Sequence, residues 1–239
     1  DTWKSRGLGD VYKRQPVEYT LPGIHQVQVL REKGLDFSRA LRSLMRQDPD
    51  IILVGETRDK ETAQTAMEAA LTGHMVFTTL HANDTATAIT RLNEMGIPPY
   101  LVGSSVIGVM AQRLVRKVCT SCATTKQVNS EDILASKYKL NKIKIPTINE
   151  NTRQNENLCP ICNGSGYKGR LGLYEVLKVN DNIRELIMKS STADVIRDAS
   201  VEYGLKTLLD YGMELVKEQL TTIEEVERVC ILEESRDEQ

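Results

Sequence analysis

Residues 16 to 118 alternate between short apolar runs and segments whose apolar residues recur with a helical period. The predicted strands are 25–30, 51–54 and 74–81, and the predicted helices are 35–47, 59–73 and 83–96. Asp36 and Asp84 stand where helix N-caps belong, because their side chains can accept hydrogen bonds from the first free amides. Strands that alternate with helices predict a parallel α/β sheet.

The next apolar segment, 98–117, reads as one largely buried helix. The alternation then ends, and the polar stretch that follows has few large apolar residues. Further elements are predicted after Gly172: a strand at 173–179 and helices at 181–189, 193–203, 205–218 and 222–232. The last helix begins with a predicted capping box formed by Thr222 and Glu225.

Composition narrows the class of protein. The 31 basic residues are balanced by 33 acidic residues, which argues against a general nucleic-acid binder because such proteins carry a basic surplus. The longest apolar run, about 101–111, is shorter than the roughly 20 residues that span a bilayer. No signal peptide is recognisable. We interpret the chain as a cytoplasmic protein.

The cysteines carry the most specific local pattern. Cys119-x-x-Cys122 and Cys159-x-x-Cys162 are two pairs separated by 36 residues. Two such pairs can complete a tetrahedral S4 zinc site with bonds of about 2.3 Å, and the metal would stabilise a polar insert that cannot build a core. The alternatives are four unrelated thiols or a redox pair. Cys230, alone on a helix, reads as a packed or free thiol.

Polar residues gather at the ends of two predicted strands. Glu56 follows 51–54, where it is either a solvated residue or a functional acid. His74 and His81 stand at the two ends of the next strand, and His81 lies in a loop at the edge where such sheets bind ligands. Three arginines surround the same region in sequence: Arg42, Arg46 and Arg58. Their guanidinium groups suit phosphate oxygens, although each could equally form a salt bridge.

A strand that delivers a carboxylate to its carboxyl end is typical of P-loop ATPases. Its usual partner, a Gly-rich loop ending in Gly-Lys-Ser/Thr, occurs nowhere in the 239 residues. The chain thus shows one half of a nucleotide site.

Six segments in order give a family resemblance: "GIHQVQV", "LRSLMRQDPDIILVGETRD", "TGHMVFTTLHAND", "AITRLNEMGIPP", "AQRLVRKVC" and "CPICNGSGYKGRLGLYEVL". They resemble the type II secretion and type IV pilus assembly ATPases. The resemblance covers roughly 16–232, nearly the whole chain. The tetracysteine pattern is similar to that of the zinc-containing assembly branch, whereas retraction motors of the superfamily lack it.

The resemblance implies an α/β fold: a truncated RecA-like P-loop NTPase core at 16–118, a tetracysteine zinc element at 119–170 and a mainly helical subdomain at 171–239. The family's P-loop lies upstream of Pro16, where this chain has residues without a helical or strand period. Residues 1–15 are therefore expected to be a foreign or disordered tail, with an uncovered region left in the sheet. A divergent native amino terminus is the alternative.

The resemblance also implies roles for individual residues. Glu56 maps onto the acid near magnesium and the attacking water, and His81 onto the residue near the terminal phosphate. Glu18 lies in the remnant of the Asp box, whose two preceding acids are replaced by Arg14 and Gln15. The implied nucleotide or intersubunit contacts are Arg42, Arg46, Arg58 and His74.

The function implied is that of a homo-hexameric motor ATPase that uses ATP and Mg²⁺, carries structural Zn²⁺, and powers type II secretion or type IV pilus assembly. Its implied partners are inner-membrane platform and adaptor proteins, which places it at the cytoplasmic face of that membrane, with no nucleic-acid partner. Without a P-loop the chain by itself is expected to be inactive. The alternative is a non-catalytic docking module stabilised by zinc.

Overall fold

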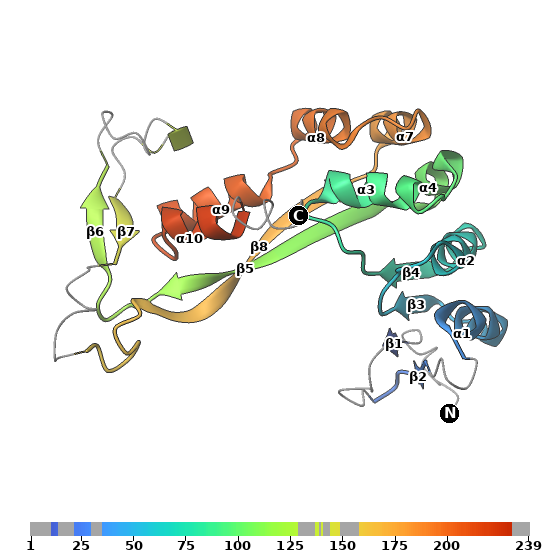
Figure 1. Cartoon of the computed structure of the whole chain (residues 1–239), viewed down its shortest axis with the longest axis horizontal. Coiled ribbons are helices and arrows are strands. Elements are labelled where there is room, and N and C mark those ends of the chain that lie inside the picture. Colours follow the sequence, from blue (N-terminus) through green and yellow to red (C-terminus); the bar gives the residue numbers. More distant parts are fainter. Residues whose placement is uncertain are drawn as a thin grey trace, which may run out of the picture. The chain divides into compact units, whose positions relative to one another are not determined.

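The computed structural model describes residues 11–13, 22–29, 35–128, 137–138, 140, 144–148 and 158–230, with the backbone alone at 11–13 (Figure 1). The chain divides into two compact units, Asp1–Val109 with Leu177–Ser200, and Met110–Val176 with Val201–Gln239.

A four-stranded parallel sheet organises the first unit, with the order β2-β1-β3-β4. Its strands are β1 (Val11–Lys13), β2 (Gln26–Gln28), β3 (Ile51–Val54) and β4 (Met75–Thr78). Val54 stands opposite Thr78, so β3 and β4 end at the same level and their following loops leave from one edge. The parallel sheet and its three predicted strands are confirmed.

Strand β1 corrects one expectation. The prediction that residues 1–15 form a tail outside the sheet is wrong for Val11–Lys13, whose backbone lies between β2 and β3. Tyr12 pairs with Val27 on one side and with Val54 on the other. The physical reason is that both neighbouring strands present unpaired N–H and C=O groups, which an extended segment can satisfy. The rest of 1–15 lies outside the described residues.

One face of the sheet is covered by helices α1 (Phe37–Leu44) and α2 (Lys60–Leu71). Their buried side chains enclose Ile52 and Val54, which are almost completely removed from solvent. A short 3-10 helix, η2 (Met45–Gln47), continues α1. On the opposite face of the sheet, two large apolar side chains of β4, Met75 and Phe77, are exposed. Parallel sheets are usually covered on both faces, so these side chains mark a part of this face that the described residues leave open.

Aspartates begin the three helices that follow the sheet strands. Oδ1 of Asp36, Asp59 and Asp84 accepts a hydrogen bond from the third helical amide at 2.8, 2.8 and 2.7 Å, at the starts of α1, α2 and α3 (Thr85–Glu94). Such a cap contributes about 1 kcal/mol to a helix. The caps predicted at Asp36 and Asp84 are confirmed.

The segment 98–117 is not one helix. It forms a short helix, α4 (Pro99–Ser105), and then a long strand, β5 (Gly108–Val118). The hydroxyls of Ser104 and Ser105 donate to carbonyl groups four residues earlier, at 2.7 Å each, and β-branched residues follow. Beyond that point burial alternates with a period of two, which suits a strand.

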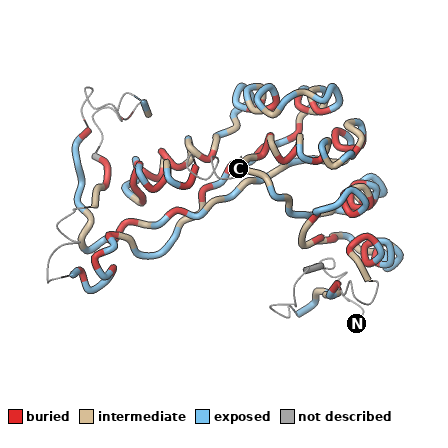
Figure 2. Tube along the Cα trace, in the orientation of Figure 1, coloured by how far each residue is buried: buried red, intermediate tan, exposed pale blue. Residues whose placement is uncertain are grey.

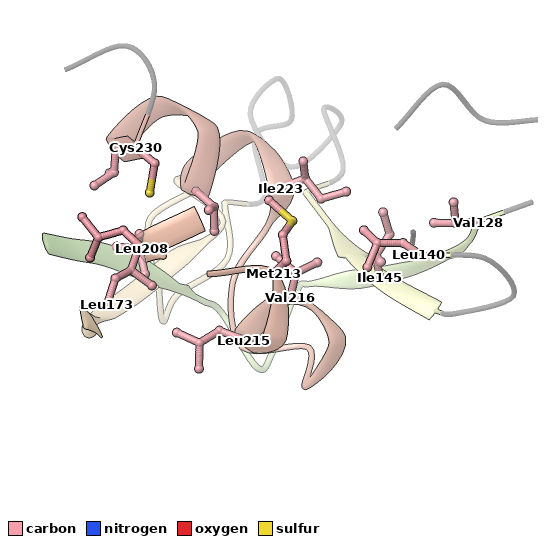
Figure 3. Packing of buried hydrophobic residues seen from close by; sticks show 13 residues of the cluster. Val128, Leu140, Ile145, Leu173, Leu208, Met213, Leu215, Val216, Ile223 and Cys230 are labelled. Atoms are coloured by element: carbon pink, nitrogen blue, oxygen red, sulfur yellow. The ribbon is translucent and has the colours of Figure 1, made fainter. Parts of the chain in front are cut away.

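The second unit is built on β5 and its partner β8 (Tyr167–Lys178). A small antiparallel pair, β6 (Thr124–Gln127) and β7 (Lys144–Thr147), and two packed helices, α9 (Leu208–Lys217) and α10 (Ile223–Cys230), complete it. Buried residues such as Leu173, Met213 and Ile223 form its core (Figure 3), and burial alternates along β5 and β8 (Figure 2).

The remaining predicted helices are confirmed by α7 (Asp181–Met188), α8 (Ala193–Glu202), α9 and α10. The predicted capping box of α10 is only half formed. Oγ1 of Thr222 accepts from the Glu225 amide at 3.3 Å, but the Glu225 carboxylate binds two arginines instead of returning to Thr222. Among the described helices, none has the length and apolar character needed to cross a membrane.

Candidate functional site

Two loops meet at the carboxyl edge of the parallel sheet. Glu56 lies just beyond the end of β3, and His81 lies just beyond the end of β4. Nε2 of His81 and Nε of Arg58 contact the same oxygen, Oε1 of Glu56. The prediction that Glu56 and His81 share one edge of the sheet is therefore confirmed, and Arg58 joins them.

Glu56 is the enclosed member of this group. Its side chain is 14% exposed, whereas those of Arg58 and His81 are 49% and 78% exposed. The guanidinium of Arg58, and after it His81, holds the pKa of Glu56 below its ordinary value, against the opposing effect of burial. Glu56 is consequently ionised near neutral pH, and an ionised carboxylate can accept a proton or a hydrogen bond from water.

Threonines tie the two loops together. The Thr57 amide donates to the Thr79 carbonyl at 2.9 Å, and Oγ1 of Thr79 donates to the Gly55 carbonyl at 2.7 Å. The hydroxyls of Thr57 and Thr78 lie 2.7 Å apart, and Thr57 is buried. Because these bonds fix the first residues of both loops, Glu56 and His81 leave the sheet at set positions.

A cleft of about 450 Å³ adjoins the group. It is lined by Thr57, Arg58, Leu80, His81, Arg91 and Met95. Three of these side chains carry or can carry positive charge, which suits an anion such as a phosphate. Sequence reasoning missed Arg91. The available signal was its place on α3, the helix that directly follows the loop of His81.

The other predicted contacts lie in different surroundings. Nδ1 of His74 is 3.0 Å from the Ala69 carbonyl, at the end of β4 away from Glu56, as its sequence position implied. Arg42 donates to Glu61 at 3.0 Å, in the first turn of α2. Arg46 is exposed on η2. Glu18 lies outside the described residues.

The four paired cysteines converge. Their sulfur atoms all lie within 4.8 Å of one another, with 3.9 Å between Cys119 and Cys159 and 3.5 Å between Cys122 and Cys162. Bonds of about 2.3 Å to a tetrahedral metal place sulfurs slightly under 4 Å apart, so the cluster fits zinc. The predicted convergence is confirmed.

The two cysteine pairs are built alike. The carbonyls of Cys119 and Cys159 each accept from the amide four residues later, at 3.0 and 2.8 Å. Amide groups of Cys162 and Ile161 lower the pKa of the Cys159 thiol to about 6. Metal binding needs thiolates, and these amides favour the thiolate form of Cys159. Filled by four protein sulfurs, the site would be structural.

Comparison with known proteins gives a consistent result. Residues 13–228 match the family described as "Type II/IV secretion system protein". The chain is 46% identical over 212 residues to the type IV pilus assembly ATPase PilB of Thermus thermophilus, covering 88% of this chain and 23% of that protein. It is 42% identical over 214 residues to the type II secretion system ATPase E of Vibrio cholerae, covering 90% and 41%.

Solved structures agree on the fold. The pilus retraction motor PilT with bound ADP superposes with a TM-score of 0.61 at 25% identity, covering 92% of this chain and 52% of that one. The ATPase DotB of Legionella pneumophila gives 0.59 at 19% identity, covering 95% and 52%. The chain spans less than half the length of the two curated relatives above. With a match over most of its length, this chain belongs to the family of type II/IV secretion system proteins.

Proposed function

We propose that this sequence is part of a motor ATPase that powers type II secretion or type IV pilus assembly by coupling ATP hydrolysis to subunit motion. The observation that carries the proposal is the group at the sheet edge, where an ionised Glu56 contacts His81 and Arg58 beside a cleft. The names of the relatives support the same activity.

The proposed roles follow from the chemistry of these side chains. The carboxylate of Glu56 orients the attacking water and accepts its proton, because it is ionised and lies just beyond the carboxyl end of β3. His81 and Arg58 face the terminal phosphate and offset the negative charge that develops on it. Arg42 and Arg46 remain proposed phosphate or intersubunit contacts, and Glu18 a proposed acid.

The proposed cofactors divide between the two units of the chain. ATP and Mg²⁺ belong at the sheet edge, where the metal would neutralise phosphate charge when bound. Zn²⁺ belongs in the cysteine cluster, where four sulfurs leave no open position for catalysis.

The proposed setting is a homo-hexamer at the cytoplasmic face of the inner membrane. There it would act on platform and adaptor proteins of a secretion or pilus machine. The support is the family membership and the names of the assembly ATPases that the chain resembles at over 40% identity.

The test is Glu56→Gln in a full-length parent protein that carries this sequence. Glutamine keeps the shape of the side chain but removes the charge, so ATP turnover should be lost while nucleotide affinity stays nearly unchanged. Glu68→Gln, an exposed α2 glutamate bonded to Gln64, is the matched control and should keep full turnover. Wild-type turnover by Glu56→Gln would refute the proposed role.

We further propose that the 239-residue chain alone is inactive. No Gly-Lys-Ser/Thr loop occurs in it, so the backbone amides that cradle phosphates in this class of ATPase are missing. Calorimetry of the purified chain with ATP should detect at most millimolar binding. Micromolar affinity would instead indicate a divergent nucleotide site.

One observation favours the docking alternative. Met110, Leu114 and Val176 are exposed on the face of β5 and β8 opposite the core. Exposed apolar side chains of this kind often mark protein contacts. A partner that binds the zinc-loaded chain without nucleotide, and is lost on Met110→Ser with Val176→Ser, would support docking as the function of this unit.

A further inference from the structure

The start of α3 carries an ion pair with a residue far along the chain. Oδ1 of Asp84 accepts the Thr87 amide at 2.7 Å as the helix cap, and Oδ2 accepts from Nη2 of Arg197 on α8 at 2.6 Å. The other terminal nitrogen of Arg197 donates to Asp194 at 2.6 Å, which holds the guanidinium in place. Both oxygens of Asp84 are thus used, one within α3 and one across to α8.

This pair is more enclosed than an ordinary surface salt bridge. The Asp84 side chain is 12% exposed and that of Arg197 is 33% exposed. Although burial raises it, the pKa of Asp84 stays below its ordinary value because the Thr87 amide and the Arg197 guanidinium favour the carboxylate. Removing one partner of a partly buried pair leaves the other charge poorly hydrated. The loss of folding free energy is therefore larger than for an exposed pair.

The position of the pair connects it to the candidate site. The loop that carries His81 runs from Thr79 to Asp84. Its first end is tied to the neighbouring loop through Thr79, and its second end is tied to α8 through Asp84. His81 lies between these two anchors, and its highly exposed side chain has little packing of its own to hold it.

We propose that Arg197 is a positioning residue: it anchors the far end of the His81 loop to α8 and thereby keeps His81 against Glu56. The relevance of this contact to ATP hydrolysis rests on the proposed function, but the contact itself does not. A displacement of α8 would then move the His81 loop through the Arg197–Asp84 pair and change the contact between His81 and Glu56.

The chain offers well-matched variants for a test. Arg197→Ala removes the anchor, and Arg197→Lys restores a positive charge with poorer geometry. Asp84→Asn removes the ion pair but keeps a good helix cap, which separates the anchor from the stability of α3. Arg184→Ala is the control, because Arg184 is 35% exposed and joins α7 to the Gly103 carbonyl away from the His81 loop.

The readout is the imidazole ring of His81, measured by long-range ¹H–¹⁵N NMR on the zinc-loaded chain, which has 3 histidines in all. Glu56→Ala, which removes the oxygen that His81 contacts, sets the positions of the ring signals for the free imidazole. In Arg197→Ala and Asp84→Asn the His81 signals should move at least about a third of the way toward those positions, because exchange averages the bound and free states. In Arg197→Lys the His81 signals should lie between those of Arg197→Ala and those of the wild type.

Unmoved His81 signals in Asp84→Asn would overturn the inference, and so would equal movement in Arg184→Ala, which would indicate general loosening. If Arg197→Ala does not fold, Asp84→Asn decides. In the full-length parent, Arg197→Ala should lower kcat about tenfold with little change in KM, as expected for a misplaced catalytic group. If the signals move but kcat does not, the positioning stands and the catalytic role of His81 fails.

Discussion

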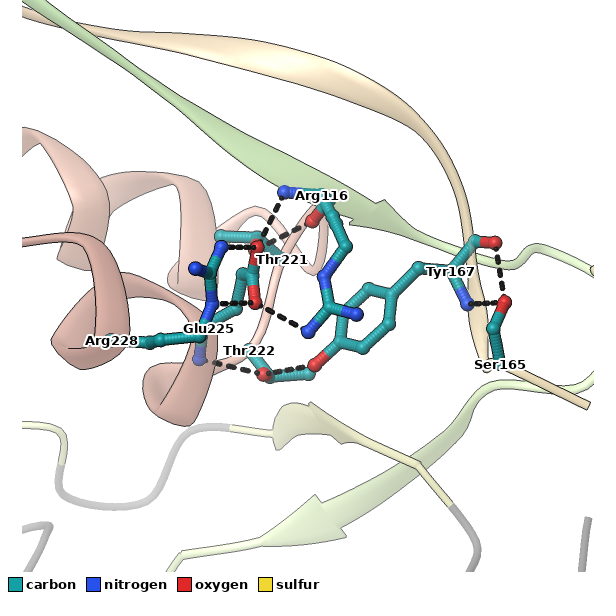
Figure 4. A network of polar contacts seen from close by, with 7 residues as sticks. All are labelled: Arg116, Ser165, Tyr167, Thr221, Thr222, Glu225 and Arg228. Atoms are coloured by element: carbon teal, nitrogen blue, oxygen red, sulfur yellow. Dashed lines mark hydrogen bonds and ion pairs between the residues drawn. The ribbon is translucent and has the colours of Figure 1, made fainter. Parts of the chain in front are cut away.

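The carboxylate of Glu225 on α10 is fully enclosed yet accepts four hydrogen bonds (Figure 4). Its Oε1 accepts from the Arg116 amide at 3.0 Å and from Nη2 of Arg228 at 2.8 Å. Its Oε2 accepts from Nη2 of Arg116 at 2.7 Å and from Nε of Arg228 at 3.0 Å. Glu225 therefore joins β5 to α10 through both backbone and side chain.

The surrounding contacts extend this junction to β8. The Arg116 guanidinium lies 4.1 Å from the centre of the Tyr167 ring, and the Tyr167 hydroxyl is 2.9 Å from Oγ1 of Thr222. Oγ1 of Thr221 donates to the Arg116 carbonyl at 2.9 Å. Three elements far apart in sequence are thus held by one polar network, and we predict that Glu225→Gln destabilises the second unit.

The size of the effect can be worked from the structure. Burial opposes the charge of Glu225, but Arg228 and Arg116 lower its pKa from 4.5 to about 2. At about 1.4 kcal/mol per tenfold change in proton affinity, this corresponds to roughly 3 kcal/mol of folding free energy. Breaking a buried ion pair costs about 3–5 kcal/mol. Both guanidiniums are 46% exposed and can be rehydrated, so we expect about 2–3 kcal/mol.

The assay is urea unfolding of the zinc-loaded chain near neutral pH, followed by hydrogen exchange of amides in the second unit. Glu224→Gln is the matched control, because it makes the same change on the exposed neighbour in α10 and should shift the unfolding free energy by less than about 0.5 kcal/mol. A loss below about 1 kcal/mol in Glu225→Gln, or an equal loss in Glu224→Gln, would refute the reasoning.

The pH dependence gives a second check. The folded-state pKa is depressed, so the contribution of Glu225 is complete above its unfolded value of 4.5 and is lost as pH falls toward about 2. The difference between wild type and Glu225→Gln should stay constant between about pH 6 and 8 and narrow only in acid. A difference that changes between pH 6 and 8 would assign the effect to another group.

Two further predictions concern the same unit. Elemental analysis should find about one zinc per chain, and chelation should loosen the segments around Cys119 and Cys162 before the rest, as seen by hydrogen exchange, unless the cluster binds no metal. Gly212→Ala should cost about 1–3 kcal/mol, because the added Cβ would lie 2.4 Å from Cγ1 of Val226. Adding Val226→Ala should cost less than the sum of the two single changes.

The local features of the fold could be predicted because their causes are local. An aspartate before a helical segment caps it through its own side chain, which is why Asp36 and Asp84 were placed correctly. The meeting of Glu56 and His81 was predictable for a related reason. Adjacent parallel strands end at the same edge, so the residues that follow them must come close.

The failures have long-range causes. Residues 98–117 contain apolar side chains compatible with a helix or a strand, and the partner strand β8 begins only at Tyr167. Pairing with β8 decides the conformation, and periodicity within the segment cannot reveal it. The half-formed capping box at Thr222 has partly the same origin, since the Glu225 carboxylate binds Arg116 of β5, 109 residues earlier in sequence, as well as Arg228 of its own helix.

The candidate site shows where pattern reasoning ends. Its centre follows from strand order and needs only residues within one or two elements. Its supports do not: Arg91 reaches the cleft from the last turn of α3, and Arg197 reaches Asp84 across 113 residues of sequence. An arginine on an exposed helix face carries no sign of its partner, because surface salt bridges and positioning contacts use the same residue type. The burial of Asp84 is what distinguishes the Arg197 contact from an ordinary surface salt bridge. Burial depends on how the whole chain packs, so the sequence pattern does not reveal it.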